Sequence, residues 1–176
     1  MRLGVSRRAL YAMRDQGELE QVSRGLYRVT SMPALEAPDL VTVARRAPRG
    51  IVCLVSALAY YELTTQVPHA VHIAVPRGSE PPRIEYPPVH VYWFSGAAYE
   101  EGIETHKVDK VPLRIYSPEK TLADTFKYRH KIGMDVVLEA LHLWHERRSR
   151  HVEKLLAHAR HDRVERIIRP YLEAIQ

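Results

Sequence analysis

Four side chains near the start of the chain have the chemistry and the spacing of a nucleic-acid contact: Arg7, Arg8, Tyr11 and Arg14. On a helix they lie on the side opposite the small and apolar residues between them, which is the arrangement of a recognition helix. Guanidinium groups bind phosphate oxygens or the edge of guanine, and a tyrosine ring can pack against a sugar or a thymine methyl group. The pattern therefore predicts contacts to DNA from this segment.

Two local elements must position these side chains. Ser6 can accept a backbone N–H bond and begin a helix, and Gly17 can adopt the positive φ that ends one. After the glycine, strand-like runs at residues 19–22 and 26–29 flank a turn at residues 23–25. They predict a hairpin, or wing, that carries arginine toward phosphate or the minor groove. The predicted DNA-binding residues are Ser6, Arg7, Arg8, Tyr11, Arg14, Arg24 and Arg28.

The charge distribution agrees with this prediction. Residues 1–29 contain six arginines and three acidic residues, residues 30–116 contain eight basic and nine acidic residues, and residues 117–176 contain twelve and nine. The net charge of +5 is therefore concentrated at the two ends of the chain. Such a concentration is expected for an electrostatic footprint on nucleic acid.

A second basic set lies in the C-terminal third of the chain. The segment from Ser117 to Arg129 predicts an amphipathic helix, with the serine as N-cap, Pro118 at the first helical position and a solvated polar face. The alternative is that its basic residues, together with later ones, form a surface that contacts an anionic partner such as a DNA or RNA backbone. The residues expected on this basic surface are Lys120, Lys127, Arg129, Lys131, Arg147, Arg148 and Arg150.

Ten histidines raise the question of a metal site. His142 and His145 are three apart on a predicted helix and close enough to share an ion, but the sequence identifies no third ligand that would converge on them. His69 and His72 bracket the start of a predicted strand and face opposite sides of it. We therefore expect no metal ion and no other cofactor.

A nuclease is the sharpest enzymatic alternative, because metal-dependent nucleases use clustered carboxylates at strand ends. The predicted strands at residues 70–75 and 89–94 contain no Asp or Glu, and Glu119 and Asp124 are spaced so that they point in different directions on a helix. None of the common hydrolase, phosphate-loop or dinucleotide motifs occurs. We expect a protein without enzymatic activity.

The composition is that of a globular protein of 176 residues, with 45% hydrophobic and 27% charged residues. No apolar run approaches the ~20 residues that a membrane helix requires, and we see no secretory signal. Cys53 is the only cysteine and lies in an apolar run, so we expect a small buried side chain and no intrachain disulfide. These features predict a cytoplasmic protein.

The pattern of periodicity predicts two parts. Residues 1–32 form a partial winged helix-turn-helix module, residues 30–39 resemble a linker with Pro33 and Pro38, and residues 38–176 form a second domain. In that domain we expect helices near 39–47, 56–61, 118–129 and 134–148 and in the tail from 152, and strands at 70–75, 89–94, 103–108 and 111–116. The fold class is α+β, a partial winged helix-turn-helix followed by a mixed α/β domain with C-terminal helices.

Several segments, in order along nearly the whole chain, resemble AbiEi antitoxins: GVSRRALY, GELEQVSRGLYRV, CLVSALAYYELTTQVPHAVHIAVPRG, RIYSPEKTLADTFKYRHKIGMDVVLEAL and RPYLEAI. The resemblance implies an antitoxin of a type IV toxin–antitoxin system, linked to abortive infection by phage. It implies a winged-helix domain that represses its own operon by binding inverted repeats in operator DNA. It also implies a C-terminal domain that counters a nucleotidyltransferase-like toxin, generally without forming a stable complex with it.

The chain departs from the family pattern at its start. Family members usually carry one or two helices before the turn that this chain has at residues 3–5, and Met1 falls just ahead of that turn. We therefore expect a shortened module in which Ala9, Leu10 and Met13 are exposed, and weaker DNA binding than a longer form would show. The alternatives are an interaction-only antitoxin or orphan regulator that does not bind an operator, or a nuclease. The oligomeric state is left open.

Overall fold

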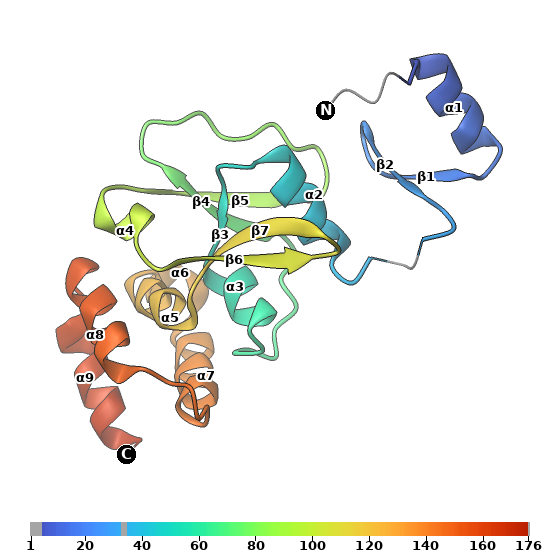
Figure 1. The fold of residues 1–176 in the computed structure, drawn as a ribbon. Helices are drawn as coiled ribbons and strands as arrows, with labels where there is room; N and C mark the ends of the chain where they lie inside the picture. Colours follow the sequence, from blue (N-terminus) through green and yellow to red (C-terminus); the bar gives the residue numbers. More distant parts are fainter. Residues whose placement is uncertain (1–4, 33–34, 176) are drawn as a thin grey trace.

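The computed structural model describes residues 5–32 and 35–175. Within these residues nine helices and seven strands form a small N-terminal unit and a larger body built on a mixed sheet (Figure 1). The expected fold class, α+β, is confirmed. The turn expected at residues 3–5 and the proline at position 33 of the expected linker lie wholly or partly outside the described residues.

The N-terminal unit consists of one helix and one hairpin: α1 (Arg7–Asp15), β1 (Leu19–Ser23) and β2 (Leu26–Val29). The Ser6 hydroxyl accepts a hydrogen bond from the backbone N–H of Ala9 at 3.2 Å, as expected of an N-cap. Gly17 has a φ of +76°, which ends the helix. The two strands pair antiparallel, with Leu19 opposite Val29. The elements expected for a recognition helix and a wing are therefore present.

The larger body contains a five-stranded sheet with the order β5-β4-β3-β7-β6. Strands β4 and β5 are parallel, as are β3 and β7, and the remaining pairs are antiparallel. The hairpin between β6 and β7 turns at Asp109 and Lys110, both of which have positive φ, as expected for a two-residue turn that matches the strand twist. The strands are β3 (Ile51–Val52), β4 (Val71–Pro76), β5 (Val89–Phe94), β6 (Ile103–Val108) and β7 (Val111–Tyr116).

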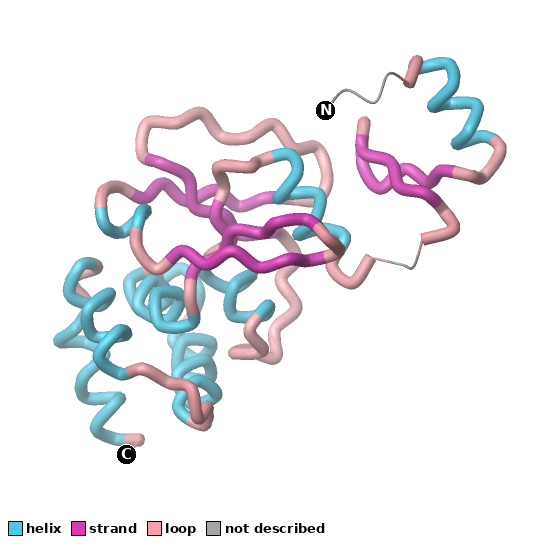
Figure 2. The backbone as a smooth tube through the Cα atoms, viewed as in Figure 1, coloured by secondary structure: helices cyan, strands magenta, loops and turns pink. Residues whose placement is uncertain are grey.

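Helices cover both faces of this sheet (Figure 2). Helix α2 (Pro38–Arg46) buries Val43 against Ile73 and Val75 of β4. On the other side, α3 (Leu54–Tyr60) and α5 (Pro118–Lys127) pack beneath the strands and join a helical layer centred on Trp144 and Phe126. The other helices are α4 (Ala97–Glu100), α6 (Arg129–Ile132), α7 (Met134–His145), α8 (Val152–His161) and α9 (Glu165–Ala174).

Local sequence rules hold at the start of α5. The Ser117 hydroxyl accepts a hydrogen bond from the backbone N–H of Lys120 at 3.3 Å, and Pro118 occupies the first helical position. The helix expected over residues 118–129 is divided, since α5 ends at Lys127 and the short α6 follows. No helix in the described ranges has the length and apolar character needed to cross a membrane.

Candidate nucleic-acid interface

The basic face of α1 is exposed. Arg7, Tyr11 and Arg14 are four and three residues apart, so they form one stripe along the helix, and Arg8 lies beside it. Tyr11 is 45% exposed. The Arg14 guanidinium lies over the Tyr11 ring at 5.1 Å from its centroid, which fixes the two side chains against each other. This stripe presents cationic and aromatic groups together, the combination expected from the sequence.

The arginines of this face differ in their partners. Arg14 donates to Asp15 Oδ1 at 2.7 Å, and that hydrogen bond and the negative charge of Asp15 raise the pKa of Arg14. Arg7 and Arg8 form no ion pair with any other described residue. Their guanidinium groups are therefore available to an external anion, whereas Arg14 would have to leave or share Asp15.

The hairpin carries its two arginines in different ways. Arg24, at the turn, has an 80% exposed side chain and contacts Glu85 Oε1 at 2.6 Å. Arg28 has only a 15% exposed side chain, pairs with Glu20 on the adjacent strand, and donates to the carbonyl oxygen of Met32 at 3.3 Å. The structure thus places Arg28 inside the unit, where it braces the hairpin, and the expectation of a DNA-facing Arg28 is corrected.

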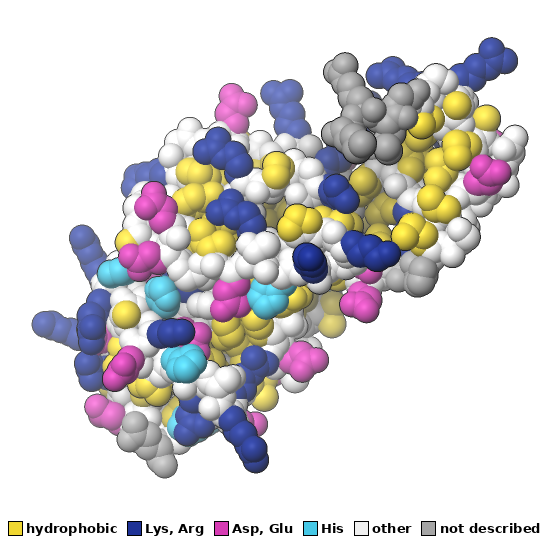
Figure 3. Space-filling view, viewed as in Figure 1, with side chains coloured by type: hydrophobic (Ala, Val, Ile, Leu, Met, Phe, Trp, Pro, Cys, Tyr) yellow, Lys and Arg dark blue, Asp and Glu magenta, His cyan; other side chains and the backbone are white. Residues whose placement is uncertain are grey.

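An apolar surface adjoins the basic face. Ala9 is exposed, as expected, whereas Leu10 and Met13, which were also expected to be exposed, are half-buried. None of the residues of α1 is buried. Val29 and Met32 are 45% and 47% exposed. Figure 3 shows apolar side chains gathered over the N-terminal unit. The helix is held mainly through its contacts with β1.

Lys120, expected on a basic surface, is buried. Its side chain is 1% exposed, and its Nζ donates to Asp124 one turn later and to Asp162 Oδ2 at 3.3 Å. The rings of Phe94 and Tyr116 lie 5.2 and 5.0 Å from the same nitrogen. The expectation that Lys120 contributes to a basic surface is wrong, because α8 and the residue that follows it cover this side of α5.

The two buried carboxyl groups that contact Lys120, those of Asp124 and Asp162, have pKa values shifted in opposite directions. Burial raises the pKa of Asp124, against the opposing effect of the Lys120 charge. Burial would also raise the pKa of Asp162, but the charge of Lys120 and the hydrogen bond from Lys127 outweigh it and lower the pKa below its usual range. Asp162 is therefore the charged acceptor of the network, and Asp124 is the group that takes up a proton more readily.

The other residues of the expected basic surface fall into two groups at opposite ends of α7. Lys127, Arg129 and Lys131 precede this helix, and Arg147, Arg148 and Arg150 follow it. Twelve helical residues span roughly 18 Å, so the structure does not gather the two groups into one patch. Several also have internal partners: Lys127 with Asp162 at 2.8 Å, Arg129 with Phe126 O at 2.9 Å, Arg147 with Tyr61 O, and Arg150 with Arg147 O at 3.1 Å.

The carboxylates considered for a nuclease are internal. Glu119 is buried and accepts hydrogen bonds from Trp144 Nε1 at 3.2 Å and from the backbone N–H of His151 at 3.3 Å. Asp124 turns instead toward Lys120. In the part of the chain that the structure describes, no three His, Cys, Asp or Glu side chains are grouped so that they could hold a metal ion. Cys53 is fully buried, and burial raises the pKa of its thiol.

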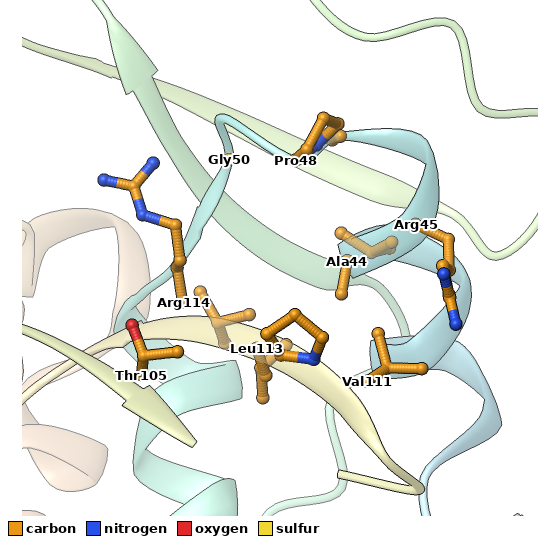
Figure 4. Close-up of a pocket in the computed structure, with 12 residues that line it drawn as sticks. Ala44, Arg45, Pro48, Gly50, Thr105, Val111, Leu113 and Arg114 are labelled. Carbon is orange, nitrogen blue, oxygen red and sulfur yellow. The ribbon is translucent and has the colours of Figure 1, made fainter. Parts of the chain in front are cut away.

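A cavity of about 400 Å³ lies between α2 and the β6–β7 hairpin (Figure 4). Its walls are mostly apolar, with Ala44, Val111 and Leu113 among them. The side chains of Arg45 and Arg114 lie at opposite ends of it in Figure 4. Within the described part of the chain, no acidic or histidine side chain lines this cavity, so its described lining lacks the convergent groups of an acid–base site.

Sequence reasoning missed the partners of these residues. Glu85 lies 61 residues from Arg24, and Asp162 lies 42 residues from Lys120. No local pattern links such positions. His72 and His90 are each the second residue of a strand, but only the parallel pairing of β4 with β5 brings them together.

The N-terminal unit therefore consists of an exposed basic helix followed by a hairpin, the two elements expected of a recognition helix and a wing. Residues 1–30 match the family model described as transcriptional regulator, AbiEi antitoxin. The resemblance found in the sequence is thereby confirmed over those residues, and the match supports an AbiEi-type antitoxin transcriptional regulator. Comparison with curated proteins gives no match for the chain.

Proposed function

We propose that the chain is an antitoxin of a type IV toxin–antitoxin system that also represses its own operon. Residues 1–32 would form the winged-helix DNA-binding module, and residues 38–176 the antitoxin domain. The observation that carries the DNA-binding proposal is the exposed stripe of Arg7, Tyr11 and Arg14 on α1, which lies within the segment that matches the regulator family.

The contacts can be assigned by chemistry. Arg7 and Arg8, which have no internal ion pair among the described residues, would bind phosphate or the O6 and N7 atoms of guanine. Tyr11, held by Arg14, would pack against a deoxyribose or a thymine methyl group. Ser6 would act by starting the helix, and Arg24 at the tip of the hairpin would contact an adjacent phosphate.

The proposed partners follow from the family resemblance. The DNA partner would be the inverted repeats of the operator upstream of its own operon. The functional partner would be a nucleotidyltransferase-like toxin, countered in the cytoplasm as part of phage defence and without a stable complex. The exposed basic residues at either end of α7, such as Lys131 and Arg148, are separate candidates for anionic contacts in the antitoxin domain.

Fluorescence anisotropy with the upstream DNA and a scrambled duplex, at two salt concentrations, tests the DNA-binding proposal. We expect binding that is selective for the upstream DNA and that Arg8→Ala weakens. If Arg8 contacts a base, the loss of binding free energy should be ~1–3 kcal/mol. If Arg8 contacts phosphate, the slope of log affinity against log salt concentration should fall in magnitude by about 1. Arg166→Ala is the matched control, because Arg166 is an exposed arginine of α9 at the far end of the chain.

Equal and weak binding to both duplexes would contradict the operator proposal. It would favour the alternative of an interaction-only antitoxin or orphan regulator that does not bind an operator. One observation supports this alternative, because the arginines at positions 14, 24 and 28 are each already paired with an acidic residue of the same chain. An equal effect of Arg8→Ala and Arg166→Ala would mean that only net charge matters, and would contradict a specific role for α1.

A further inference from the structure

Two imidazole rings lie side by side on neighbouring strands of the central sheet. Strands β4 and β5 are parallel and pair His72 directly with His90. Paired residues of adjacent strands project to the same face, and the strands are about 4.8 Å apart. The ring centroids are accordingly 5.1 Å apart, with the planes inclined by 38°. This separation is within the span over which two imidazoles can share one ion.

The two rings differ in their surroundings. His90 is exposed, whereas His72 is half-buried, and its Nδ1 atom is buried with no hydrogen-bond partner among the described residues. Burial, together with the charge of His90, lowers the pKa of His72 to about 4. His72 is thus a neutral imidazole at pH 7, which is the state in which histidine binds metal ions.

The rings open onto a groove of about 740 Å³ between the sheet and α6. His69 and Tyr92 also line it, and no aspartate or glutamate of the described ranges does. Among the described residues that line it, Lys131 is the one lysine or arginine, and its ammonium group lies 5.8 Å from the Tyr128 ring. A nitrogen-lined groove without carboxylates excludes Mg²⁺ and Ca²⁺ as its preferred ions and favours Zn²⁺, Ni²⁺ or Cu²⁺.

We propose that His72 and His90 chelate a divalent transition-metal ion at the floor of this groove. No third protein ligand joins them in the described ranges, so the other coordination positions belong to water or to a small anion that enters the groove. The site is independent of the N-terminal unit and of the DNA-binding proposal.

Titration of the full chain with Zn²⁺ against a chromogenic chelator tests this proposal, with Mg²⁺ as the comparison ion. We expect about one zinc ion per chain, no competition from Mg²⁺, and affinity at least about tenfold lower for His90→Gln, since loss of a ligand costs no less than loss of an outer-shell partner. His90 is exposed, so this variant keeps its fold, which circular dichroism verifies; His72→Gln should have the same effect.

His142→Gln is the matched control, because His142 and His145 form another closely spaced histidine pair, on α7 and away from the groove. It should leave zinc affinity unchanged. Unaltered binding by a folded His90→Gln variant would overturn the proposal, and so would a loss of binding confined to His142→Gln. Absence of zinc binding by the wild-type chain would overturn it as well.

Discussion

Replacing Lys120 by methionine tests whether the buried charge network joins α5 to the C-terminal helices. Methionine preserves most of the side-chain volume and removes only the ammonium group, which contacts Asp124 and Asp162. Asp162 keeps Lys127, whose Nζ lies 2.8 Å away. Asp124 loses its cation while remaining fully buried. The perturbation is therefore one uncompensated buried carboxyl group.

The expected cost follows from that geometry. Removing one partner of a buried ion pair destabilises proteins by about 3–5 kcal/mol. Asp124 can limit the cost by taking up a proton, since burial already raises its pKa and loss of Lys120 removes the charge that opposes this rise. We expect Lys120→Met to lower the free energy of unfolding by about 3 kcal/mol near pH 8, which for a chain of this size lowers Tm by roughly 6–12 °C.

The pH dependence has a definite sign. A carboxyl group whose pKa is raised in the folded state binds more protons when folded than when unfolded, so its contribution to stability is lost as pH rises through the folded pKa. The variant should therefore be less destabilised, relative to wild type, at pH 5 than at pH 8. Asp162 has a lowered pKa and keeps a cation in both proteins, so its own contribution declines only at more acid pH.

Urea unfolding followed by tryptophan fluorescence is the assay, because Trp144 is buried in the same helical layer. Lys127→Met is the control, because the Lys127 side chain is 39% exposed and Asp162 retains its contact with Lys120. We expect this variant to lose less than about 1 kcal/mol in the free energy of unfolding. Lys120→Met/Asp124→Asn should recover much of the loss, because a neutral amide no longer leaves a buried charge. Equal destabilisation by the two lysine variants, or a cost independent of pH, would refute the reasoning.

Three further predictions concern other contacts. If Arg24 contacts phosphate as proposed, Glu85→Gln should strengthen binding to the upstream DNA by up to about fivefold, because the exposed pair between Glu85 and Arg24 must open first. An identical gain in an Arg24→Ala background would contradict this cause. Gly102→Ala should lower the free energy of unfolding by about 1–3 kcal/mol, because the φ of Gly102 is +71° and a Cβ would lie 2.7 Å from the Lys120 Cβ. Gly78→Ala is the control for backbone strain alone, because Gly78 has a φ of +84° and open space around it. Thermal unfolding compares the two variants, and equal losses would exclude the steric contribution. His72 has a pKa lowered to about 4 from its ordinary 6.5, so the unfolded chain binds the extra proton and stability should decline as pH falls through this range; a His72→Gln variant with an unchanged acid profile would count against it.

Local rules account for most of the elements that were predicted correctly. Ser6 and Ser117 cap helices, Gly17 ends one, and Asp109 and Lys110 form a hairpin turn. Each of these depends on interactions within a few residues, between side chain and backbone or through the allowed φ of one residue. The stripe of Arg7, Tyr11 and Arg14 follows in the same way from helical periodicity.

Charge pattern alone could not place the long side chains. Lys120 and Lys131 look alike in the sequence, yet one is buried and the other exposed, because only the former lies beneath α8 and beside Asp162. Arg28 is likewise withdrawn from solvent by Glu20 on the paired strand. Whether a charged residue is solvated or paired depends on what the chain packs over it.

The sequence by itself determined most of the helices, strands and turns and the exposed basic helix at the amino terminus, because these depend on short-range periodicity and composition. It did not predict the two-residue strand β3 or the short helix α4. The family match over residues 1–30 agrees with the resemblance found in the sequence. Only the tertiary structure decided which residues meet across the sheet and between helices: His72 with His90, Lys120 with Asp162, and Arg24 with Glu85. Those pairings depend on strand register and helix packing, which are set by burial of the whole core and not by any segment alone.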